Sequence, residues 1–328
     1  MSDLDLPSVS VVIPTKGRIE FVERSLRELI ADPATTEIVV VIVRGVGGTA
    51  CARWQALDDR VRTIEADEGA SDVMERGAFA RDQGVLSATG EVILALDDDV
   101  VPRPGLVSGH ARRHASDPCL LVLGYMPVSR PKPGGLTGTA RVYSASYERE
   151  CARFAADSEA ILLGLWGGNY SLRRTHWLAS LELPRIPAGY HGDREFGLRL
   201  RKLGLRAAFD PVLRADHLYA RSLTALVEDA RSAGIGHARL LSAYPELRTY
   251  PGAAPRVPMR IVKRATRGDA AWRVTSAVLH TLANSASGGK LPALEDMSIR
   301  LMWQLSFERG LREATASDNR RPAPAPDR

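Results

Sequence analysis

The chain has 328 residues, of which 45% are hydrophobic, and this is enough to bury one large core with an appended helical part. Its net charge of +5 arises from 44 basic and 39 acidic residues mixed along the chain, which excludes a basic nucleic-acid-binding arm. The three cysteines are far apart and form neither a zinc pattern nor a disulfide framework, which favours a reducing compartment. Residues 1–5 do not resemble a signal peptide, and no run approaches the roughly 18 apolar residues of a membrane span. We therefore expect a cytoplasmic protein, attached at most peripherally to the inner face of the membrane.

Strand and helix patterns alternate through the first hundred residues. Short apolar runs predict strands at 9–13, 38–43, 61–64 and 92–96. Amphipathic segments between them predict helices around 22–30 and over 72–86. This alternation predicts an α/β fold with a mainly parallel sheet that is flanked by helices.

The second half contains fewer strand signals. We expect a strand at 120–123, helices at 141–160 and 193–203, and a short strand at 207–211. The sequence is helical and amphipathic from about residue 223, with another helix at 297–311, and the end of the chain is rich in proline. The expected domains are a catalytic domain at 1–220, a helical C-terminal extension at 221–315 and a disordered tail at 316–328.

Three carboxylates, Asp97, Asp98 and Asp99, directly follow the apolar run at 92–96. Such a cluster repels itself unless a positive group lies on it, and hard divalent cations prefer oxygen ligands of this kind. The carboxyl end of a parallel strand is also where open α/β sheets bind ligands. The alternative is a solvated acidic turn.

Further motifs occur in a fixed order around this triplet. The first strand leads into Pro14-Thr15-Lys16-Gly17-Arg18, and a later helix starts with Gly192-Asp193-Arg194-Glu195-Phe196. Residues 77–84, Gly-Ala-Phe-Ala-Arg-Asp-Gln-Gly, are similar to a helix that reads Gly-x-x-x-Ala-Arg-Asn-x-Gly. From about residue 9 to 217 the chain resembles the family 2 glycosyltransferases. These are inverting enzymes of the GT-A fold that use a nucleotide-sugar donor and a divalent metal, so the resemblance implies a GT-A-like catalytic domain.

The resemblance assigns the metal and the nucleotide to the acidic triplet. It implies that Asp97 and Asp99 bind the ribose and the metal of the donor, with Asp98 assisting. His217 matches a histidine that some members place near the metal and diphosphate; the alternative is a structural histidine. Oxygen ligands with one imidazole favour Mn²⁺ or Mg²⁺, which stabilises the charge that develops on a diphosphate leaving group.

Asp193 matches the general base of the family, which takes the proton of the acceptor hydroxyl. The helix dipole is expected to hold its carboxylate ionised without a raised pKa. The alternative is that Asp193 only caps the helix. Arg81 matches an arginine on the diphosphate side of the donor; otherwise it is a solvent-facing helix residue.

Two further segments match donor contacts in the family. Pro14, Thr15 and Arg18 match the loop that receives the nucleotide base. Trp166, Gly168 and Asn169 match the segment in front of the donor sugar. Trp166 fits a place in the core equally well.

The chain departs from the family pattern after the second strand. The family usually places there an acid that contacts uracil, whereas residues 43–48, Val-Arg-Gly-Val-Gly-Gly, contain no carboxylate. Asp67 or Glu68, after the third strand, is a substitute contact to the base. Asp82 replaces the usual asparagine of the helix motif, which is a smaller change.

The reaction implied is metal-dependent, inverting transfer of a sugar from a nucleotide-diphosphate sugar to a hydroxyl of a glycan, lipid-linked or small-molecule acceptor, without nucleic acid as a partner. One competing interpretation is a sugar-phosphate nucleotidyltransferase, which normally has a longer glycine-rich loop after its first strand. The other is a non-catalytic nucleotide-sugar-binding protein, which would not need Asp193.

The extension contains one segment, 256–282, with a pattern of its own. Residues 256–273 carry six basic residues against one acid, and Val274, Val278, Leu279 and Leu282 follow at helical spacing. Basic residues beside an apolar helix face fit peripheral membrane contact or a lipid-phosphate acceptor. The simpler interpretation, which we prefer from sequence, is that the apolar face packs on the catalytic domain and the acceptor is diffusible.

Overall fold

The computed structural model of the protein describes residues 6–44, 46–66, 75–129, 136–248 and 268–318. The chain divides into two compact units. Unit 1 comprises Met1–Pro131, Tyr147–Arg185 and Gly192–Tyr219. Unit 2 comprises Lys132–Ser146, Ile186–His191 and Ala220–Arg328. The last segment of unit 2 starts at Ala220, and two short upstream segments also belong to it, whereas the expected catalytic domain includes all of residues 1–220.

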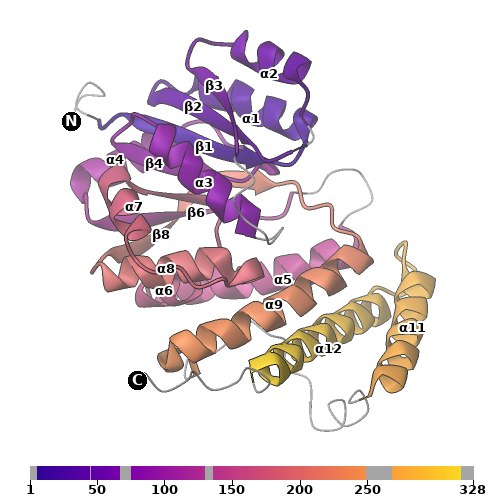
Figure 1. Cartoon of the computed structure of the whole chain (residues 1–328). Coiled ribbons are helices and arrows are strands. Elements are labelled where there is room, and N and C mark those ends of the chain that lie inside the picture. The colour runs from indigo at the N-terminus through magenta and orange to yellow at the C-terminus, as the bar shows by residue number, and fades with distance from the viewer. Residues whose placement is uncertain (1–5, 45, 67–74, 130–135, 249–267, 319–328) are drawn as a thin grey trace, which may run out of the picture. The chain divides into compact units, whose positions relative to one another are not determined.

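Unit 1 contains a mixed sheet in the order β3-β2-β1-β4-β7-β6-β8-β5 (Figure 1). The strands are β1 Val9–Thr15, β2 Thr35–Ile42, β3 Val61–Glu65, β4 Val92–Leu96, β5 Val100–Pro102, β6 Leu120–Tyr125, β7 Asn169–Arg173 and β8 Arg206–His217. β3, β2, β1 and β4 run parallel to one another, as do β6 and β8. β7 is antiparallel to both of its neighbours, and β5 is antiparallel to β8.

Helices flank this sheet, as the alternating pattern predicts. They are α1 Ile19–Ala31, α2 Gly48–Gln55, α3 Glu75–Ser87, α4 Leu106–Ser116, α6 Glu159–Gly164, α7 Arg174–Leu181, α8 Gly192–Lys202 and the second half of α5 Gly138–Ala156. α1 buries Val22, Leu26 and Leu29 on one face, which is the amphipathic pattern seen in the sequence. The predicted α/β fold class is therefore confirmed.

The centre of the core lies on β1, β2 and β4, whose apolar side chains are almost completely buried. α3 packs closely on this centre at Gly84, which has no side chain. A Cβ atom at this position would collide with side-chain atoms of Val12 and Val41. This close approach brings Arg81, about one turn earlier on α3, toward the ends of β1 and β4.

The predicted strands at 9–13, 38–43, 61–64, 92–96 and 120–123 are all present, but β8 is longer than expected. Pro211 was expected to end that strand, yet β8 continues to His217. The register with β6 shifts between Asp210 and Arg214, so Pro211 lies in an irregularity of the ladder. The helix expected at 141–160 consists of α5 and α6, and residues 72–74 of another expected helix lie outside the described residues.

Unit 2 is helical, in agreement with the prediction for the extension. It contains the first half of α5, the helices α9 Leu223–Ala243, α11 Asp269–Ala286 and α12 Pro292–Asp318, and the short η2 Gly189–His191 and η3 Pro245–Arg248. α9 and α12 approach closely at Gly234 and Gly310. A Cβ atom at either glycine would collide with the backbone of the facing helix. Arg141 of α5 bonds Glu295 and Asp296 of α12, at 2.7 Å each.

Two sequence expectations about unit 2 concern its ends. The predicted disordered tail overlaps α12 at residues 316–318, and residues 319–328 lie outside the described part of the chain. Most of the basic segment, residues 256–267, also lies outside it. No helix within the described ranges is both long and apolar enough to cross a membrane.

Candidate active site

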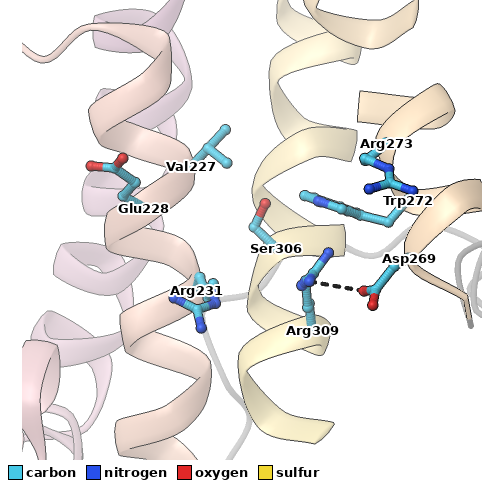
Figure 2. A pocket seen from close by; sticks show the side chains of 8 residues that line it. All are labelled: Val227, Glu228, Arg231, Asp269, Trp272, Arg273, Ser306 and Arg309. Carbon is cyan, nitrogen blue, oxygen red and sulfur yellow. Dashed lines mark hydrogen bonds and ion pairs between the residues drawn. The ribbon is translucent and has the colours of Figure 1, made fainter. Parts of the chain in front are cut away.

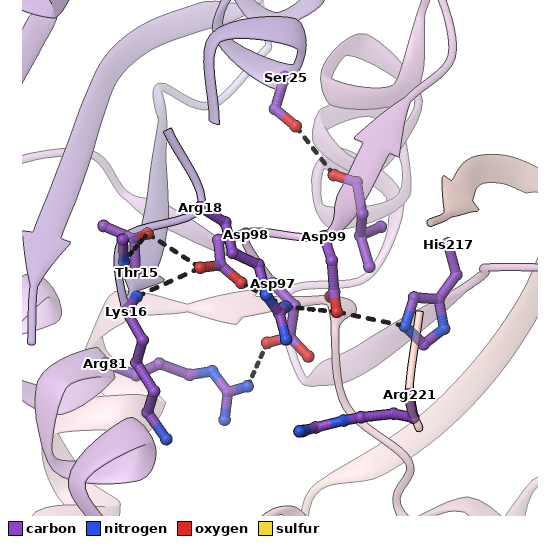
Figure 3. Close-up of polar contacts among 12 residues, drawn as sticks. Thr15, Lys16, Arg18, Ser25, Arg81, Asp97, Asp98, Asp99, His217 and Arg221 are labelled. Carbon is purple, nitrogen blue, oxygen red and sulfur yellow. Dashed lines mark hydrogen bonds and ion pairs between the residues drawn. The ribbon is translucent and has the colours of Figure 1, made fainter. Parts of the chain in front are cut away.

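The acidic triplet lies where β4 ends, beside the end of the parallel neighbour β1. Asp98 joins the two strand ends, because its carboxylate accepts hydrogen bonds from Thr15 Oγ1 at 2.9 Å and from the backbone N–H of Lys16 at 3.3 Å (Figure 3). Arg18 donates to the other oxygen of Asp98 at 2.8 Å. Burial raises the pKa of Asp98, although Arg18 opposes this shift. The main role of Asp98 is therefore to link the segment after β4 to the segment after β1.

Asp99 is placed beside His217 by the pairing of β5 with β8. Val100 lies opposite His217 in this ladder, and the backbone N–H of Leu218 donates to the carbonyl of Asp99 at 2.8 Å. His217 Nε2 lies 3.6 Å from Asp99 Oδ2, as Figure 3 shows. Arg18 also bonds Asp99. The extended β8 thus delivers the histidine that the sequence pairs with the triplet.

Arg81 connects the triplet to the start of α8. Its guanidinium bonds Asp97 and, at 2.8 Å, Asp193 Oδ1. Asp193 also accepts a hydrogen bond from the backbone N–H of Gly167. The side chains of Asp97 and Asp193 remain 35% and 28% exposed, so a ligand can reach both carboxylates. Arg81 is consequently not a solvent-facing helix residue.

Gly167 and Gly168 form the wall between these two carboxylates. A Cβ atom at Gly167 would lie 2.5 Å from the carboxyl carbon of Asp193, and one at Gly168 would lie 3.1 Å from Asp97 Oδ2. Gly168 also has a φ of +113°, and its carbonyl accepts the N–H of Asp97 at 3.1 Å. Only glycine allows the backbone to pass this close to both acids.

The charges in this cluster shift the pKa of Asp193 in a direction that the helix dipole alone does not predict. Burial raises the pKa of Asp193, Arg81 lowers it, and the nearby Asp97 raises it further. For Arg81, burial favours the neutral form, but Asp193 and Asp97 outweigh it and raise the pKa well above its ordinary value. Asp193 is not the N-cap residue either, because α8 begins one residue earlier at Gly192.

Asp99, His217 and Asp97 carry the ligand types that Mn²⁺ and Mg²⁺ take, namely carboxylate oxygens and one imidazole. Asp99 and His217 lie close enough to share one ion. Among the residues that the structure describes, no three such side chains are already gathered around one point. Arg18 bonds Asp99, and Arg81 bonds Asp97. The residues therefore fit a cation chemically, provided that it competes with these two guanidiniums.

A comparison with known protein families identifies the chain. The model described as glycosyltransferase like family 2 matches residues 7–232, which is more than half of the sequence. The chain belongs to the family 2 glycosyltransferases. No curated protein is similar enough in sequence to match it.

Solved structures share the fold of this family 2 chain. Mannosyltransferase PcManGT from Pyrobaculum calidifontis, in complex with GDP-Man and Mn²⁺, is 17% identical with a TM-score of 0.57, over 95% of this chain and 88% of that one. Glucosyl-3-phosphoglycerate synthase from Mycobacterium tuberculosis, in complex with Mg²⁺ and UDP, is 18% identical with a TM-score of 0.51, over 76% and 83% of the two chains. The predicted GT-A-like fold is therefore confirmed.

Trp166 and Asn169 differ in their access to the family 2 site. Trp166 is partly exposed, and its ring packs edge-on against Tyr147 at 5.5 Å between centroids. Asn169 is fully buried, and its amide bonds Leu213 O at 3.0 Å and His110 Nε2 at 3.1 Å. Its amide is thus used inside the protein, which conflicts with the predicted contact to a donor sugar.

The positions of Pro14, Asp67 and Asp82 say less about how a donor would bind. Pro14 is partly buried within β1, opposite Val41 of β2. Asp67, the proposed substitute contact to the base, lies outside the described residues. Asp82 accepts a hydrogen bond from Trp177 Nε1 at 2.9 Å and bonds Arg185. The charge of Arg185 gives a physical reason for an aspartate where the family has asparagine.

Sequence reasoning missed two features of the site. One is that Arg18 lies on Asp98 and Asp99, so it is the positive group that the triplet requires. The other is the backbone N–H of Gly167, which bonds Asp193. The adjacent glycines were the only signal for the second feature, because a backbone donor leaves no side-chain trace in a sequence.

Proposed function

We propose that this family 2 glycosyltransferase moves a sugar from a nucleotide-diphosphate sugar to an acceptor hydroxyl with inversion at the anomeric carbon. The observation that carries the proposal is the bridge made by Arg81. It brings a carboxylate from the end of β4 and one from the start of α8 to a single guanidinium. This reaction needs a donor-binding acid, here Asp97, beside a base, here Asp193. A protein that only binds nucleotide sugars would not need the base.

In the proposed reaction, Asp193 accepts the proton of the acceptor hydroxyl. The hydroxyl oxygen forms a bond to the anomeric carbon on the face opposite the diphosphate, and the bond from that carbon to the diphosphate oxygen breaks. The nucleotide diphosphate leaves with the electron pair, which inverts the configuration. Arg81 keeps Asp193 ionised against the burial that raises its pKa. The backbone of Gly167 fixes the carboxylate in its orientation.

The proposed cofactor is Mn²⁺ or Mg²⁺. Asp99 and His217 would hold it, with Asp97 as a third ligand, while Thr15 and Arg18 keep the loop in place through Asp98. A divalent cation supplies charge stabilisation for the diphosphate. Support comes from the chemistry of these ligands and from the two solved relatives of like fold, whose complexes contain Mn²⁺ or Mg²⁺.

The donor contacts of Pro14, Arg18, Arg81, Trp166 and Gly168 are part of the same proposal. The predicted contact of Thr15 is not included, because its side chain is fully buried and its hydroxyl bonds Asp98. Arg81 and the two glycines lie against the acids that would hold the donor. Trp166 precedes these glycines and is partly exposed, so an aromatic edge borders the site. Asn169 is not included, because its amide is bonded inside the protein.

A donor screen tests this proposal directly. UDP-, GDP- and dTDP-sugars are incubated with the full chain, Mn²⁺ and a mixture of hydroxyl acceptors, and nucleoside diphosphate release is measured. Release that requires Mn²⁺ and is lost in Asp193→Asn supports sugar transfer, and NMR of the product gives the anomeric configuration. Formation of nucleoside triphosphate and sugar 1-phosphate from the nucleotide sugar and added pyrophosphate would instead identify a nucleotidyltransferase. Binding of a nucleotide sugar without turnover on any acceptor or water would favour the non-catalytic interpretation.

A further inference from the structure

A second site candidate lies in unit 2, among α9, α11 and α12. Side chains from the three helices line a cavity of about 480 Å³ (Figure 2). This volume falls in the range of about 300–1,000 Å³ that is usual for small-molecule sites. We call this site the helical cavity. Its lining includes Val227, Arg231, Trp272, Arg273, Ser306 and Arg309.

The apolar side of the helical cavity rests on the core of unit 2. Val227 and Trp272 pack against a cluster formed by Leu279, Met302 and Leu305. The ring of Trp272 is held further by Arg309, whose guanidinium carbon lies 5.3 Å from the ring centroid. The cavity therefore offers a fixed aromatic and aliphatic surface to an apolar or planar group.

The charged side of the cavity leaves one arginine uncompensated. Arg309 bonds both Asp269 and Glu313 at 3.0 Å, and Arg231 bonds Glu313 at 2.6 Å. Within the described ranges, Arg273 has no ion-pair partner. Glu228 is the remaining acid of the lining, and Figure 2 shows its carboxylate projecting from the side of α9 away from α12. The surplus charge that faces the cavity is therefore positive.

Ser306 gives an independent indication of a ligand. Its side chain is 1% exposed and lines the cavity. In the part of the chain that the structure describes, its hydroxyl has no hydrogen-bond partner. A buried hydroxyl without a partner destabilises a fold, so such groups are usually satisfied by a ligand or a bound water. The hydroxyl of Ser306 can donate to an anionic oxygen in the cavity.

We propose that the helical cavity binds a phosphate ester that carries an apolar or planar group. The guanidinium of Arg273 matches the oxygens of a phosphate, Ser306 donates a hydrogen bond to the ligand, and Trp272 and Val227 contact the apolar part. Such an ester comes either from a lipid headgroup or from a soluble metabolite. The exposed surface of α11 suggests the lipid source, because Val274 directly follows Arg273, Val278 lies one turn further along the helix, and the two valines are 66% and 53% exposed.

The test uses the full chain, two variants of the cavity and one matched control for each. Arg273→Gln and Ser306→Ala remove the two polar groups. Arg300→Gln removes an exposed arginine of α12, and Ser298→Ala removes a buried, unpartnered hydroxyl of the same helix, both outside the lining. One arm measures sedimentation with phosphatidylglycerol or phosphatidylcholine vesicles. The other measures calorimetric binding of phenyl phosphate and of inorganic phosphate. Circular dichroism shows that each variant is folded.

Binding should weaken roughly tenfold or more in Arg273→Gln and several-fold in Ser306→Ala, whereas the two controls bind like the wild type. Dependence on phosphatidylglycerol supports the proposal with a lipid as the source. Binding of phenyl phosphate alone, more tightly than inorganic phosphate, supports it with a soluble source. If neither probe binds, or if the controls weaken binding as much as the cavity variants, the helical cavity is not a phosphate site. None of these outcomes depends on glycosyl transfer.

Discussion

The two polar sites of this protein differ in the sign of their surplus charge. In unit 1, the carboxylate site contains Asp97, Asp98, Asp99 and Asp193, and among the described residues the guanidiniums of Arg18 and Arg81 form ion pairs with them. In the helical cavity of unit 2, Arg231 and Arg309 have carboxylate partners, whereas Arg273 has none among the residues that the structure describes. A site with excess carboxylate favours a cation, and one with excess guanidinium favours an anion. We therefore predict a cation at the first site and an anion at the second from the charges that remain uncompensated, and not from the total number of charged residues.

The two sites also differ in how the chain builds them. The carboxylate site joins segments that are far apart in the sequence, because the ends of β1 and β4 and the start of α8 meet at one edge of the sheet. The helical cavity depends on the packing of helices that follow one another near the C-terminus. Three substitutions at the carboxylate site of unit 1 would test this contrast, in order of decreasing effect on turnover.

Replacing Asp99 with alanine should have the largest effect. The variant removes one of the few hard oxygen ligands, so sugar transfer should fall below detection and Mn²⁺ should no longer activate the enzyme. The fold should persist, because the backbone of Asp99 still bonds Leu218. A Mn²⁺ titration of turnover measures the effect, and Glu182→Gln, an exposed acid outside the site, is the control. Wild-type turnover in Mn²⁺ would exclude the triplet as the cation site.

Replacing Asp193 with asparagine should lower turnover on the order of a hundredfold or more, the usual effect of losing a general base. The melting temperature should change little, because the amide oxygen can still accept the bonds from Arg81 and Gly167. Steady-state kinetics and a thermal melt measure the two quantities on the same sample. A large loss of stability with turnover retained would show that Asp193 is only structural.

The pH dependence of turnover should reveal the bridge made by Arg81. The base acts when ionised, so turnover falls as the pH drops through the pKa of Asp193, which burial raises above the ordinary 3.8. In Arg81→Lys, a single ammonium cannot bond both carboxylates as the guanidinium does. The interaction that lowers the pKa of Asp193 is therefore weaker, and this pKa rises. We expect about a tenfold slower reaction, the scale of about one pKa unit in free energy, and an acidic limb displaced to higher pH. An unchanged limb would argue against the bridge.

Two buried histidines of unit 1 should affect stability and not turnover. Burial lowers the pKa of His110 to about 4 and that of His114 to about 3, from 6.5. The unfolded chain therefore binds protons below pH 6.5 that the folded protein does not bind until about pH 4, and stability is lost across this window as the pH falls. Urea unfolding at pH 7 and pH 5 measures the difference. It should shrink in His114→Gln, and an identical difference would contradict the prediction.

Part of this molecule could be predicted from sequence because its strands are buried apolar runs. β4 is an uninterrupted example, and the acids that follow it could be assigned to a strand end. β7 was not predicted because Asn169 and Ser171 make it look polar. These side chains are buried and bond His110 and His114, which are more than fifty residues away. The length of β8 was missed because the irregularity that accommodates Pro211 depends on the partner strand.

The site was predicted to a similar extent and for similar reasons. Asp97, Asp99 and Asp193 occur in motifs of fixed order, and the structure brings the first and third together through Arg81. The sequence could not show that Arg18 contacts the triplet, or that the amide of Asn169 is bonded inside the protein. Both facts depend on side-chain directions that a linear pattern does not contain. The helical cavity depends on interhelical packing and was not predicted.

The arginine shared by Asp97 and Asp193 has a consequence for the order of events in catalysis. The negative charge of Asp97 raises the pKa of Asp193, and Arg81 lowers it. A positive charge that binds Asp97 therefore offsets the rise that Asp97 causes in the pKa of Asp193. It also competes with Arg81 for Asp97, so the guanidinium can interact more strongly with Asp193. Under the proposed reaction, donor occupancy then lowers the pKa of Asp193, which favours the ionised carboxylate that the base needs. By thermodynamic linkage, deprotonation of Asp193 tightens donor binding by the same factor. The bridge thus favours a sequential mechanism in which the nucleotide sugar binds before the acceptor.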